Sequence, residues 1–178
     1  MSNMRLDWHE EFIVNLASLI RPKVYLELGL YRCALFNRIV PYAEQLVGVD
    51  ISAEAGNYMQ QSQNTRFFNG TTHEFAKELE LHPMQINMLF IDADHSKEAV
   101  LHDFKEFFPF VAPHGLILFH DTHPGNEQMI QPEWCGTAYL AVEELSKVTE
   151  SYEMMTIPLS PGLTICRKRK AQLSWREE

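Results

Sequence analysis

The stretch INMLFIDADH, residues 86–95, decides the fold class of this chain, because six apolar or near-apolar residues run directly into an acidic cluster that ends in a histidine. The stretch LILFHDTH, residues 116–123, repeats the pattern with four apolar residues. Runs of this length are typical of buried strands. In an open α/β sheet, ligands bind beyond the carboxyl ends of the strands. We therefore expect the two clusters to form one site that suits a divalent cation, a proton acceptor, or both.

Predicted strands and helices alternate along the chain. Two further apolar runs, residues 25–29 and 47–50, also carry acids at the strand end. Such alternation predicts right-handed βαβ units and a parallel sheet that is covered by helices on both faces. The predicted strands cover 23–28, 45–49, 65–68, 86–91 and 115–119, and the predicted helices cover 8–20, 31–40, 53–63, 71–81, 96–108 and 137–148.

The end of the chain breaks the alternation. Predicted strands 153–157 and 163–167 are joined by a short loop, so we expect them to pair antiparallel as a hairpin. The result is a three-layer α/β domain with a mostly parallel seven-stranded sheet. We predict one domain over residues 1–178, with an N-terminal helix within 1–21 and a polar tail over 168–178.

Composition excludes several classes of protein. The net charge of −9 argues against binding nucleic acid by general phosphate attraction. No apolar stretch approaches the roughly 20 residues of a membrane span, and acidic residues stand where a signal peptide needs an apolar segment. The three cysteines form no CxxC motif, which indicates reduced thiols. We therefore expect a cytoplasmic protein that acts on neither nucleic acid nor membranes.

The first strand-to-helix turn is a candidate cofactor site. Gly29 lets the backbone approach a ligand closely, but the GxGxxG pattern of dinucleotide-binding proteins is missing, which weakens a role in binding NAD or FAD. Asp50 follows at the end of the next strand, at the distance where a carboxylate holds a ribose diol. Both residues also fit a purely structural role.

Taken together, these motifs resemble a known family. The segments 27–29 and 47–52 look like the first two motifs of class I S-adenosylmethionine-dependent methyltransferases. The segments 90–100 and 113–122 are similar to small-molecule O-methyltransferases of the catechol and macrolide-sugar type, in which a divalent metal binds between strands four and five. The resemblance spans about residues 23–168 and implies the Rossmann-like methyltransferase fold.

The resemblance implies roles for the cofactor-binding residues. Gly29 would pass under the methionine portion of S-adenosylmethionine, with Glu27 near its ammonium group, and Asp50 would take the ribose hydroxyls. Gly70 and Thr71 would lie near the adenine. Asp92 would contact both the cofactor and the metal. Cys33 occupies a position where the family usually has glycine, and a small residue still fits there.

Methyl transfer from S-adenosylmethionine needs an activated nucleophile more than a strong acid, because the sulfonium of the cofactor is already a good leaving group. Asp92 and Asp121 are the predicted ligands of Mg²⁺ or Mn²⁺, with His120 as a third ligand that favours Mn²⁺, Fe²⁺ or Zn²⁺ over Mg²⁺. The resemblance implies that His95, three residues after Asp92, is the general base. A capping or backbone-binding role for His95 stays open, as does a role for Trp134 in covering the acceptor.

Competing interpretations remain at this point. One is an α/β domain that binds a nucleotide-like ligand without chemistry. Another is a metal-dependent phosphatase, since residues 92–96 can be read as a DxDx(T/S) nucleophile loop, although three predicted strands precede it. Our prediction is an S-adenosylmethionine-dependent O-methyltransferase that acts on a small hydroxylated molecule such as a sugar or natural product. We expect acceptor choice to depend on the opening helix, residues 122–137 and any partner subunit. A homodimer partner is the candidate source of a lid.

Overall fold

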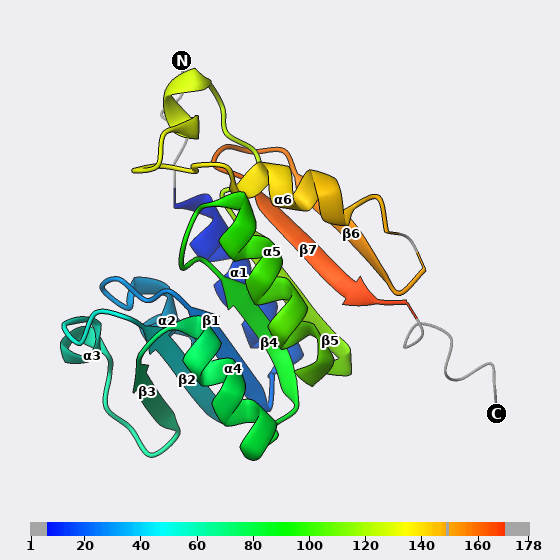
Figure 1. Ribbon diagram of the computed structural model, residues 1–178. Coiled ribbons are helices and arrows are strands. Elements are labelled where there is room, and N and C mark those ends of the chain that lie inside the picture. Colours follow the sequence, from blue (N-terminus) through cyan, green and yellow to red (C-terminus); the bar gives the residue numbers. More distant parts are fainter. Residues whose placement is uncertain (1–6, 149, 170–178) are drawn as a thin grey trace.

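The computed structural model describes residues 7–148 and 150–169, and its centre is a seven-stranded sheet in the order β3-β2-β1-β4-β5-β7-β6 (Figure 1). Neighbouring strands are parallel from β3 to β5, and β7 runs antiparallel to both β5 and β6. This confirms the predicted fold class, including the terminal hairpin. The strands are β1 Val24–Leu28, β2 Gln45–Asp50, β3 Thr65–Asn69, β4 Ile86–Ile91, β5 Val111–His120, β6 Tyr152–Ile157 and β7 Leu163–Lys168.

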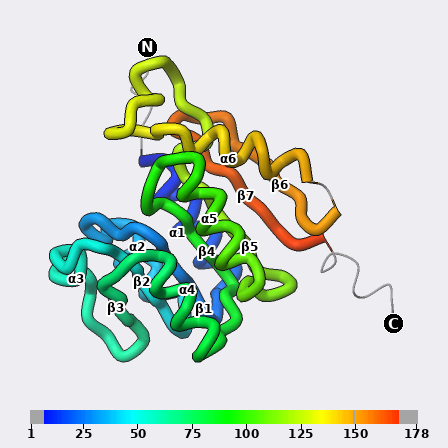
Figure 2. Tube along the Cα trace, viewed as in Figure 1, coloured from blue at the N-terminus to red at the C-terminus, as the bar shows by residue number. Residues whose placement is uncertain are grey.

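Helices cover both faces of the sheet and give it two cores. Figure 2 shows α4, α5 and α6 on the near face, and these helices bury the larger core. The second core lies on the opposite face and includes residues of α1, α2 and α3. The helices are α1 Trp8–Ile20, α2 Ala34–Ile39, α3 Ala55–Tyr58, α4 Thr72–Leu81, α5 Lys97–Phe107 and α6 Ala138–Leu145, with short 3₁₀ helices at Phe108–Phe110 and Glu127–Ile130.

Strand β4 is buried on both faces, and for this reason its sequence is one continuous apolar run. Leu89 and Ile91 belong to the core under α4–α6, whereas Met88 and Phe90 belong to the core on the other face. A strand that is buried on both faces has no solvent side, so no polar alternation appears. Each such side chain contributes about 1.5–3 kcal/mol by leaving water, which fixes the position of the acidic cluster that follows.

Helix α4 begins where the sequence predicts. The Thr71 side chain accepts a hydrogen bond from the Glu74 amide at 3.1 Å, and the Glu74 carboxylate accepts one from the Thr71 amide at 2.8 Å. This reciprocal capping box satisfies two amide groups that have no partner within the helix. The helix ends at Leu81, just before His82 and Pro83.

The structure corrects three element boundaries. Helix α2 begins at Ala34 rather than residue 31, because Tyr31 and Cys33 adopt left-handed backbone angles that extend the preceding turn. Helix α3 is a single turn. Strand β5 begins at Val111 rather than residue 115, since residues 113–115 are a bulge between two paired segments. A bulge tolerates Pro113 because its residues make no ladder hydrogen bond.

Two sequence predictions concern the ends of the chain. Lys168 ends β7 and Arg169 is described, while the rest of the predicted polar tail, 170–178, lies outside the described residues, as do residues 1–6 before α1. Among the described helices, none combines the length and the apolar character that crossing a membrane requires.

Candidate active site

The carboxyl ends of β1, β2, β4 and β5 reach the same level of the sheet. Leu28 of β1 pairs with Val49 of β2 and with Ile91 of β4, and Ile91 pairs with Phe119 of β5. The next residues in each strand or turn are therefore neighbours across one edge: Gly29, Asp50, Asp92 and His120. The structure thus gathers the four strand ends that the sequence singles out.

Gly29 sits where two backbones come too close for a side chain. Its φ is +88°, and a Cβ atom built on it would lie 2.2 Å from the carbonyl oxygen of Asp92. The Gly29 amide donates to the Val49 carbonyl, and the Asp92 amide donates to the Leu28 carbonyl, both at 2.9 Å. Glycine is required here because neither backbone can move aside.

Asp50 holds the turn that follows β1. One carboxylate oxygen accepts hydrogen bonds from the amides of Leu30 and Tyr31, at 2.9 and 3.1 Å, and the other accepts from the Ser52 amide at 2.8 Å. A carboxylate offers about four acceptor positions, so capacity for a further hydroxyl group remains. The structural role that the sequence left open for Asp50 is therefore present.

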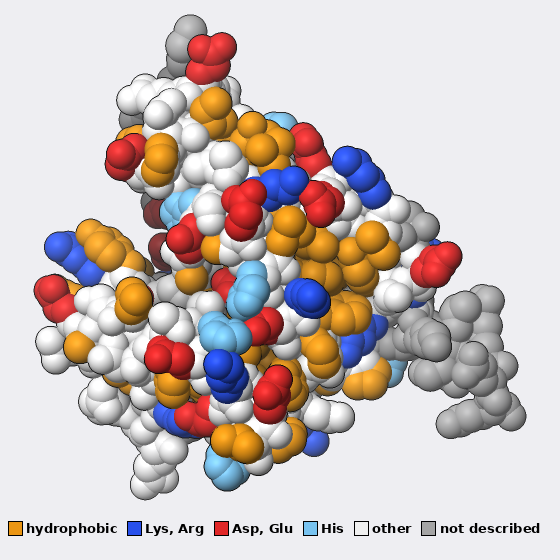
Figure 3. Space-filling view, viewed as in Figure 1, with side chains coloured by type: hydrophobic (Ala, Val, Ile, Leu, Met, Phe, Trp, Pro, Cys, Tyr) orange, Lys and Arg blue, Asp and Glu red, His pale blue; other side chains and the backbone are white. Residues whose placement is uncertain are grey.

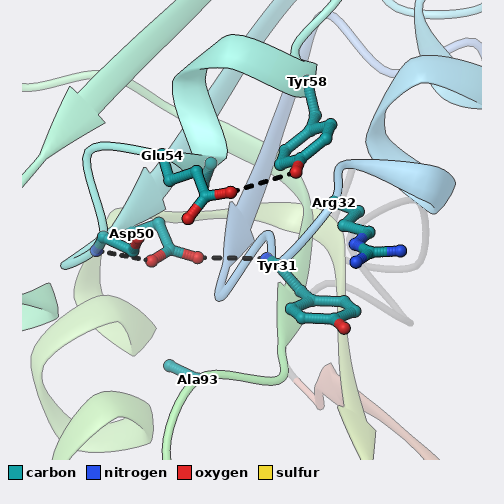
Figure 4. A pocket seen from close by; sticks show the side chains of 8 residues that line it. Tyr31, Arg32, Asp50, Glu54, Tyr58 and Ala93 are labelled. Atoms are coloured by element: carbon teal, nitrogen blue, oxygen red, sulfur yellow. Dashed lines mark hydrogen bonds between the residues drawn. The ribbon is translucent and has the colours of Figure 1, made fainter.

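Two hollows lie on either side of Asp50 and Ala93. The first, of about 360 Å³, is walled by Tyr31, Arg32 and Tyr58; Figure 4 shows Asp50 bonded to the Tyr31 amide and Ala93 facing it from below. The second, of about 400 Å³, lies on the β3 side. Its lining includes four predicted cofactor residues or their neighbours: Gly29, Ile51, Gly70 and Thr71.

A smaller hollow of about 120 Å³ extends from Gly29 toward α1, with Glu27 and Asp92 in its wall. Glu27 is 3% exposed and accepts a hydrogen bond of 2.5 Å from the Tyr25 hydroxyl. Burial raises the pKa of Glu27 well above its ordinary value, although the Tyr25 hydrogen bond opposes the shift. The carboxyl group is therefore positioned to become ionised when a cation enters the hollow.

Asp92, Asp121 and His120 form a compact charged cluster at the ends of β4 and β5. His120 Nδ1 lies 2.9 Å from an Asp92 carboxylate oxygen and 3.4 Å from one of Asp121. Burial alone would lower the pKa of His120, but the charge of Asp92 and hydrogen bonds to both carboxylates raise it to about 10. Burial likewise opposes ionisation of Asp121, yet His120 holds the pKa of Asp121 below its ordinary value.

His95 reaches the same cluster from the loop after β4. Its Nδ1 contacts the backbone carbonyl of Trp134 and lies 3.3 Å from an Asp121 oxygen, while Nε2 lies 3.7 Å from an Asp92 oxygen. A carbonyl can only accept, so Nδ1 carries the proton, and Nε2 of the neutral ring is left as the acceptor. The backbone-binding role left open by the sequence and an orientation toward the carboxylates thus occur together.

The neighbours of His95 complete the start of α5. Ser96 caps this helix by accepting from the Ala99 amide at 3.3 Å, and Asp94 accepts from the Ser96 amide at 2.7 Å. Asp94 is therefore neither the N-cap nor a ligand of the cluster in this structure. Its carboxylate instead fixes the loop that carries His95.

The residues present fit a divalent cation. Asp92, His95 and Asp121 each offer a ligand atom, and these atoms lie within 4.8 Å of one another. Two carboxylates and one imidazole suit Mn²⁺, Fe²⁺ or Zn²⁺ as well as Mg²⁺. His95, the predicted general base, stands in this group, while His120, the predicted third ligand, contacts both carboxylates through Nδ1.

Two hollows beside the cluster are lined by residues of the 122–137 segment. One of about 220 Å³ lies between His95, Asp121 and the side chains of Met129, Trp134 and Cys135. The other, of about 390 Å³, continues past His95 toward Ile130, Pro132 and Thr137. The Cys135 thiol is buried beside Asp121, and burial, followed by that charge, raises its pKa to about 12.

Sequence reasoning missed two parts of this site. The ring of His9 in α1 packs against that of His120 at an interplanar angle of 41°, with centroids 4.0 Å apart. Pro161 lines the hollow of about 220 Å³ from the hairpin loop. One signal was present for His9: it shares a buried helix face with Ile13 and Ala17 at four-residue spacing. Nothing in the sequence pattern marks Pro161.

A family model described as a methyltransferase domain matches residues 26–122, which include all four strand ends of the site. The chain belongs to this methyltransferase family. The match confirms the methyltransferase family that the sequence resembles, and it removes the phosphatase interpretation of residues 92–96.

Individual relatives of this methyltransferase are distant. An uncharacterized protein of Acanthamoeba polyphaga mimivirus is 27% identical over 129 residues, which is 64% of this chain and 58% of that protein. The chain thus spans less than two thirds of the length of this curated relative.

Solved methyltransferases share the fold. An O-methyltransferase from Bacillus cereus, in complex with SAH (S-adenosylhomocysteine), superposes with a TM-score of 0.73 at 13% identity, covering 91% of this chain and 81% of that one. The N-methyltransferase NodS from Bradyrhizobium japonicum, also in complex with S-adenosylhomocysteine, gives 0.66 at 10% identity, covering 94% and 90%. Because both acceptor types occur on one fold, the fold alone does not determine which atom is methylated.

Proposed function

We propose that this methyltransferase moves a methyl group from S-adenosylmethionine to a hydroxyl of a small molecule with the help of a divalent cation. The observation that carries the proposal is the convergence of Asp92, His95 and Asp121 beside hollows on two sides. The hollows at Gly29 suit the cofactor, and those of the 122–137 segment suit an acceptor.

The cofactor would lie along the edge of the sheet. Its adenosine would occupy the hollow lined by Gly70 and Thr71, with a ribose hydroxyl on the remaining acceptor capacity of Asp50. The methionine portion would extend over Gly29 into the smaller hollow, where its ammonium group would meet the buried Glu27. A cation beside Glu27 would offset the burial that now favours its protonated form.

The acceptor hydroxyl needs to lose its proton as the methyl group is transferred. His95 is placed for this step because Nε2 is its free acceptor atom and its ring is held by the Trp134 carbonyl. A cation held by Asp92 and Asp121 would supply Lewis-acid stabilisation of the developing oxyanion and leave His95 Nε2 to take the proton.

The chemistry of the cluster favours oxygen as the acceptor atom. Carboxylate-bound hard cations bind oxyanions well, whereas a neutral amine needs no such charge stabilisation. The hollow of about 220 Å³ has room for a single ring or a short chain, against the apolar surfaces of Met129 and Trp134. A sugar or a phenolic natural product of that size is the proposed acceptor class.

Methyl transfer can be tested directly with tritium-labelled S-adenosylmethionine and a panel of phenols, catechols and sugars. The protein is first treated with chelator and then assayed with and without Mg²⁺ and Mn²⁺. We expect turnover of at least one hydroxylated acceptor, and Asp121→Asn should lower it by about 100-fold. Glu133→Gln removes an exposed carboxylate from the neighbouring segment and should leave turnover unchanged.

The outcomes separate the alternatives. Turnover that chelation does not lower would remove the cation and leave His95 as the sole activating group. Cofactor binding without turnover of any acceptor would favour a domain that binds the nucleotide-like ligand without chemistry.

A further inference from the structure

A second group of metal-ligating side chains lies on α4 and α5, outside the candidate active site. His73 belongs to the first turn of α4, while His102 and Glu106 stand four residues apart on α5. Figure 3 shows histidine side chains side by side on the face that these helices cover. We propose that His73, His102 and Glu106 bind a divalent transition-metal ion, with Zn²⁺ as the preferred ion.

The three side chains converge on one point. His73 Nδ1 lies 2.7 Å from one Glu106 carboxylate oxygen, and His102 Nδ1 lies 3.5 Å from the other. The two imidazole rings have centroids 5.4 Å apart. One ligand atom from each residue lies within 4.8 Å of the others. Around a tetrahedral Zn²⁺ such atoms are about 3.3 Å apart, so rotation of side chains alone closes the site.

Glu106 has an oxygen that the protein leaves without a hydrogen bond. Its Oε2 atom is buried, and across residues 7–148 and 150–169 it has no hydrogen-bond partner. A buried carboxylate oxygen without a donor is costly. A metal ion between this oxygen and His102 would satisfy it. This observation points to a ligand independently of the histidine pair.

Accessibility and donor chemistry select the ion. The side chains of His73 and His102 are 47% and 51% exposed, and that of Glu106 is 22% exposed, so an ion can enter from solvent. Two imidazoles and a carboxylate suit Zn²⁺, which takes four ligands and keeps one position for water in such a set. Mg²⁺ prefers oxygen ligands. The site should therefore discriminate against Mg²⁺.

The test is a Zn²⁺ titration of the full chain after chelator treatment and removal of any histidine tag. Asp121→Asn serves as the background, because it disables the other candidate metal group and asparagine tolerates the left-handed backbone of this position, where φ is +58°. Competition with a chromophoric chelator gives the affinity. Visible absorption of bound Co²⁺ reports imidazole ligation without relying on activity.

We expect one Zn²⁺ per chain in this background. His73→Ala and His102→Ala, each added to it, should weaken binding by at least about tenfold, because loss of a direct ligand costs no less than loss of a supporting residue. His114→Ala removes an exposed histidine elsewhere and should change nothing. Absence of Zn²⁺ binding in the background, or equal affinity in all three histidine variants, would overturn the proposal.

Discussion

The two halves of the candidate site are built in different ways. In the cofactor half, backbone turns at strand ends form the walls, and Gly29 and Asp50 act chiefly through main-chain contacts. In the acceptor half, side chains from three separate segments line one hollow: His95 of the loop after β4, Trp134 of the 122–137 segment and Pro161 of the hairpin loop.

The difference decides how each half tolerates change. A wall made of backbone cannot yield to an added atom, whereas a wall made of side chains can repack around one. Substitutions that add an atom to the backbone walls of the cofactor half should therefore have large effects on binding and folding. Those in the acceptor half should change turnover or acceptor choice and leave cofactor affinity intact.

The largest effect is expected from Gly29→Ala. The added Cβ would meet the Asp92 carbonyl at 2.2 Å in a backbone conformation that alanine disfavours, so the turn must distort. We expect a loss of about 3 kcal/mol in the free energy of unfolding, measured by urea denaturation, and no detectable binding of S-adenosylhomocysteine.

Gly125→Ala is the matched control in the acceptor half. Its Cβ would meet the Ser160 side chain at 3.0 Å or more, and its backbone carries no positive φ. Unfolding free energy and cofactor affinity should stay near wild type. Equal losses in the two glycine variants would contradict the contrast between the halves.

His95→Gln should lower kcat by about 100-fold or more, the usual contribution of a positioned general base. The amide keeps a donor for the Trp134 carbonyl but cannot take a proton, so acceptor KM and cofactor affinity should change little. Steady-state kinetics with a responding acceptor measures the split. A rise in KM at constant kcat would show that His95 binds the acceptor and removes no proton.

Trp134→Ala should raise the KM for the acceptor by about tenfold, because it removes about 1.4 kcal/mol of contact from a half-exposed wall. Trp134→Phe should recover most of this loss by restoring an aromatic surface. Cofactor affinity should be unchanged in both variants. If calorimetry shows weaker S-adenosylhomocysteine binding in Trp134→Ala, the two halves are coupled through the His95 contact.

The smallest effect is expected from Thr71→Ala. Loss of the N-cap oxygen leaves the Glu74 amide without its partner and should cost about 1 kcal/mol of unfolding free energy. Thr71→Ser keeps the oxygen, so its loss of unfolding free energy should be only a small fraction of the loss in Thr71→Ala. Thermal unfolding of the pair measures the difference, and identical midpoints would rule out the capping box as a stabilising contact.

The fold and the cofactor half could be predicted because their signals are local. Apolar runs that are buried on both faces, such as Ile86–Ile91, read directly as strands, and a glycine at a strand end reads as a turn. The acids that follow these strands then lie close together, because parallel strands end at the same edge of the sheet. The start of α2 differs from its predicted position because Tyr31 and Cys33 adopt left-handed backbone angles, which no local pattern indicates.

The acceptor half could not be predicted to the same depth. His9 contacts His120 from 111 residues away in the sequence, and Pro161 lines the hollow beside Asp121 from 40 residues away, which no local pattern encodes. The bulge at 113–115 likewise depends on pairing with β4 rather than on its own turn-like sequence. The sequence leaves the role of His95 open for the same reason, since the Trp134 carbonyl that it contacts comes from a distant loop.

The most direct test of the central claim is a calorimetric titration of S-adenosylhomocysteine into the wild-type protein, Asp50→Asn and Asp121→Asn. We expect one site of micromolar affinity, about −8 kcal/mol, in wild type and in Asp121→Asn. Binding to Asp50→Asn should be at least about tenfold weaker, because a carboxylate that contacts the ribose is lost. No heat from folded wild-type protein, or equal affinity in Asp50→Asn, would contradict the assignment of this edge of the sheet as the cofactor site.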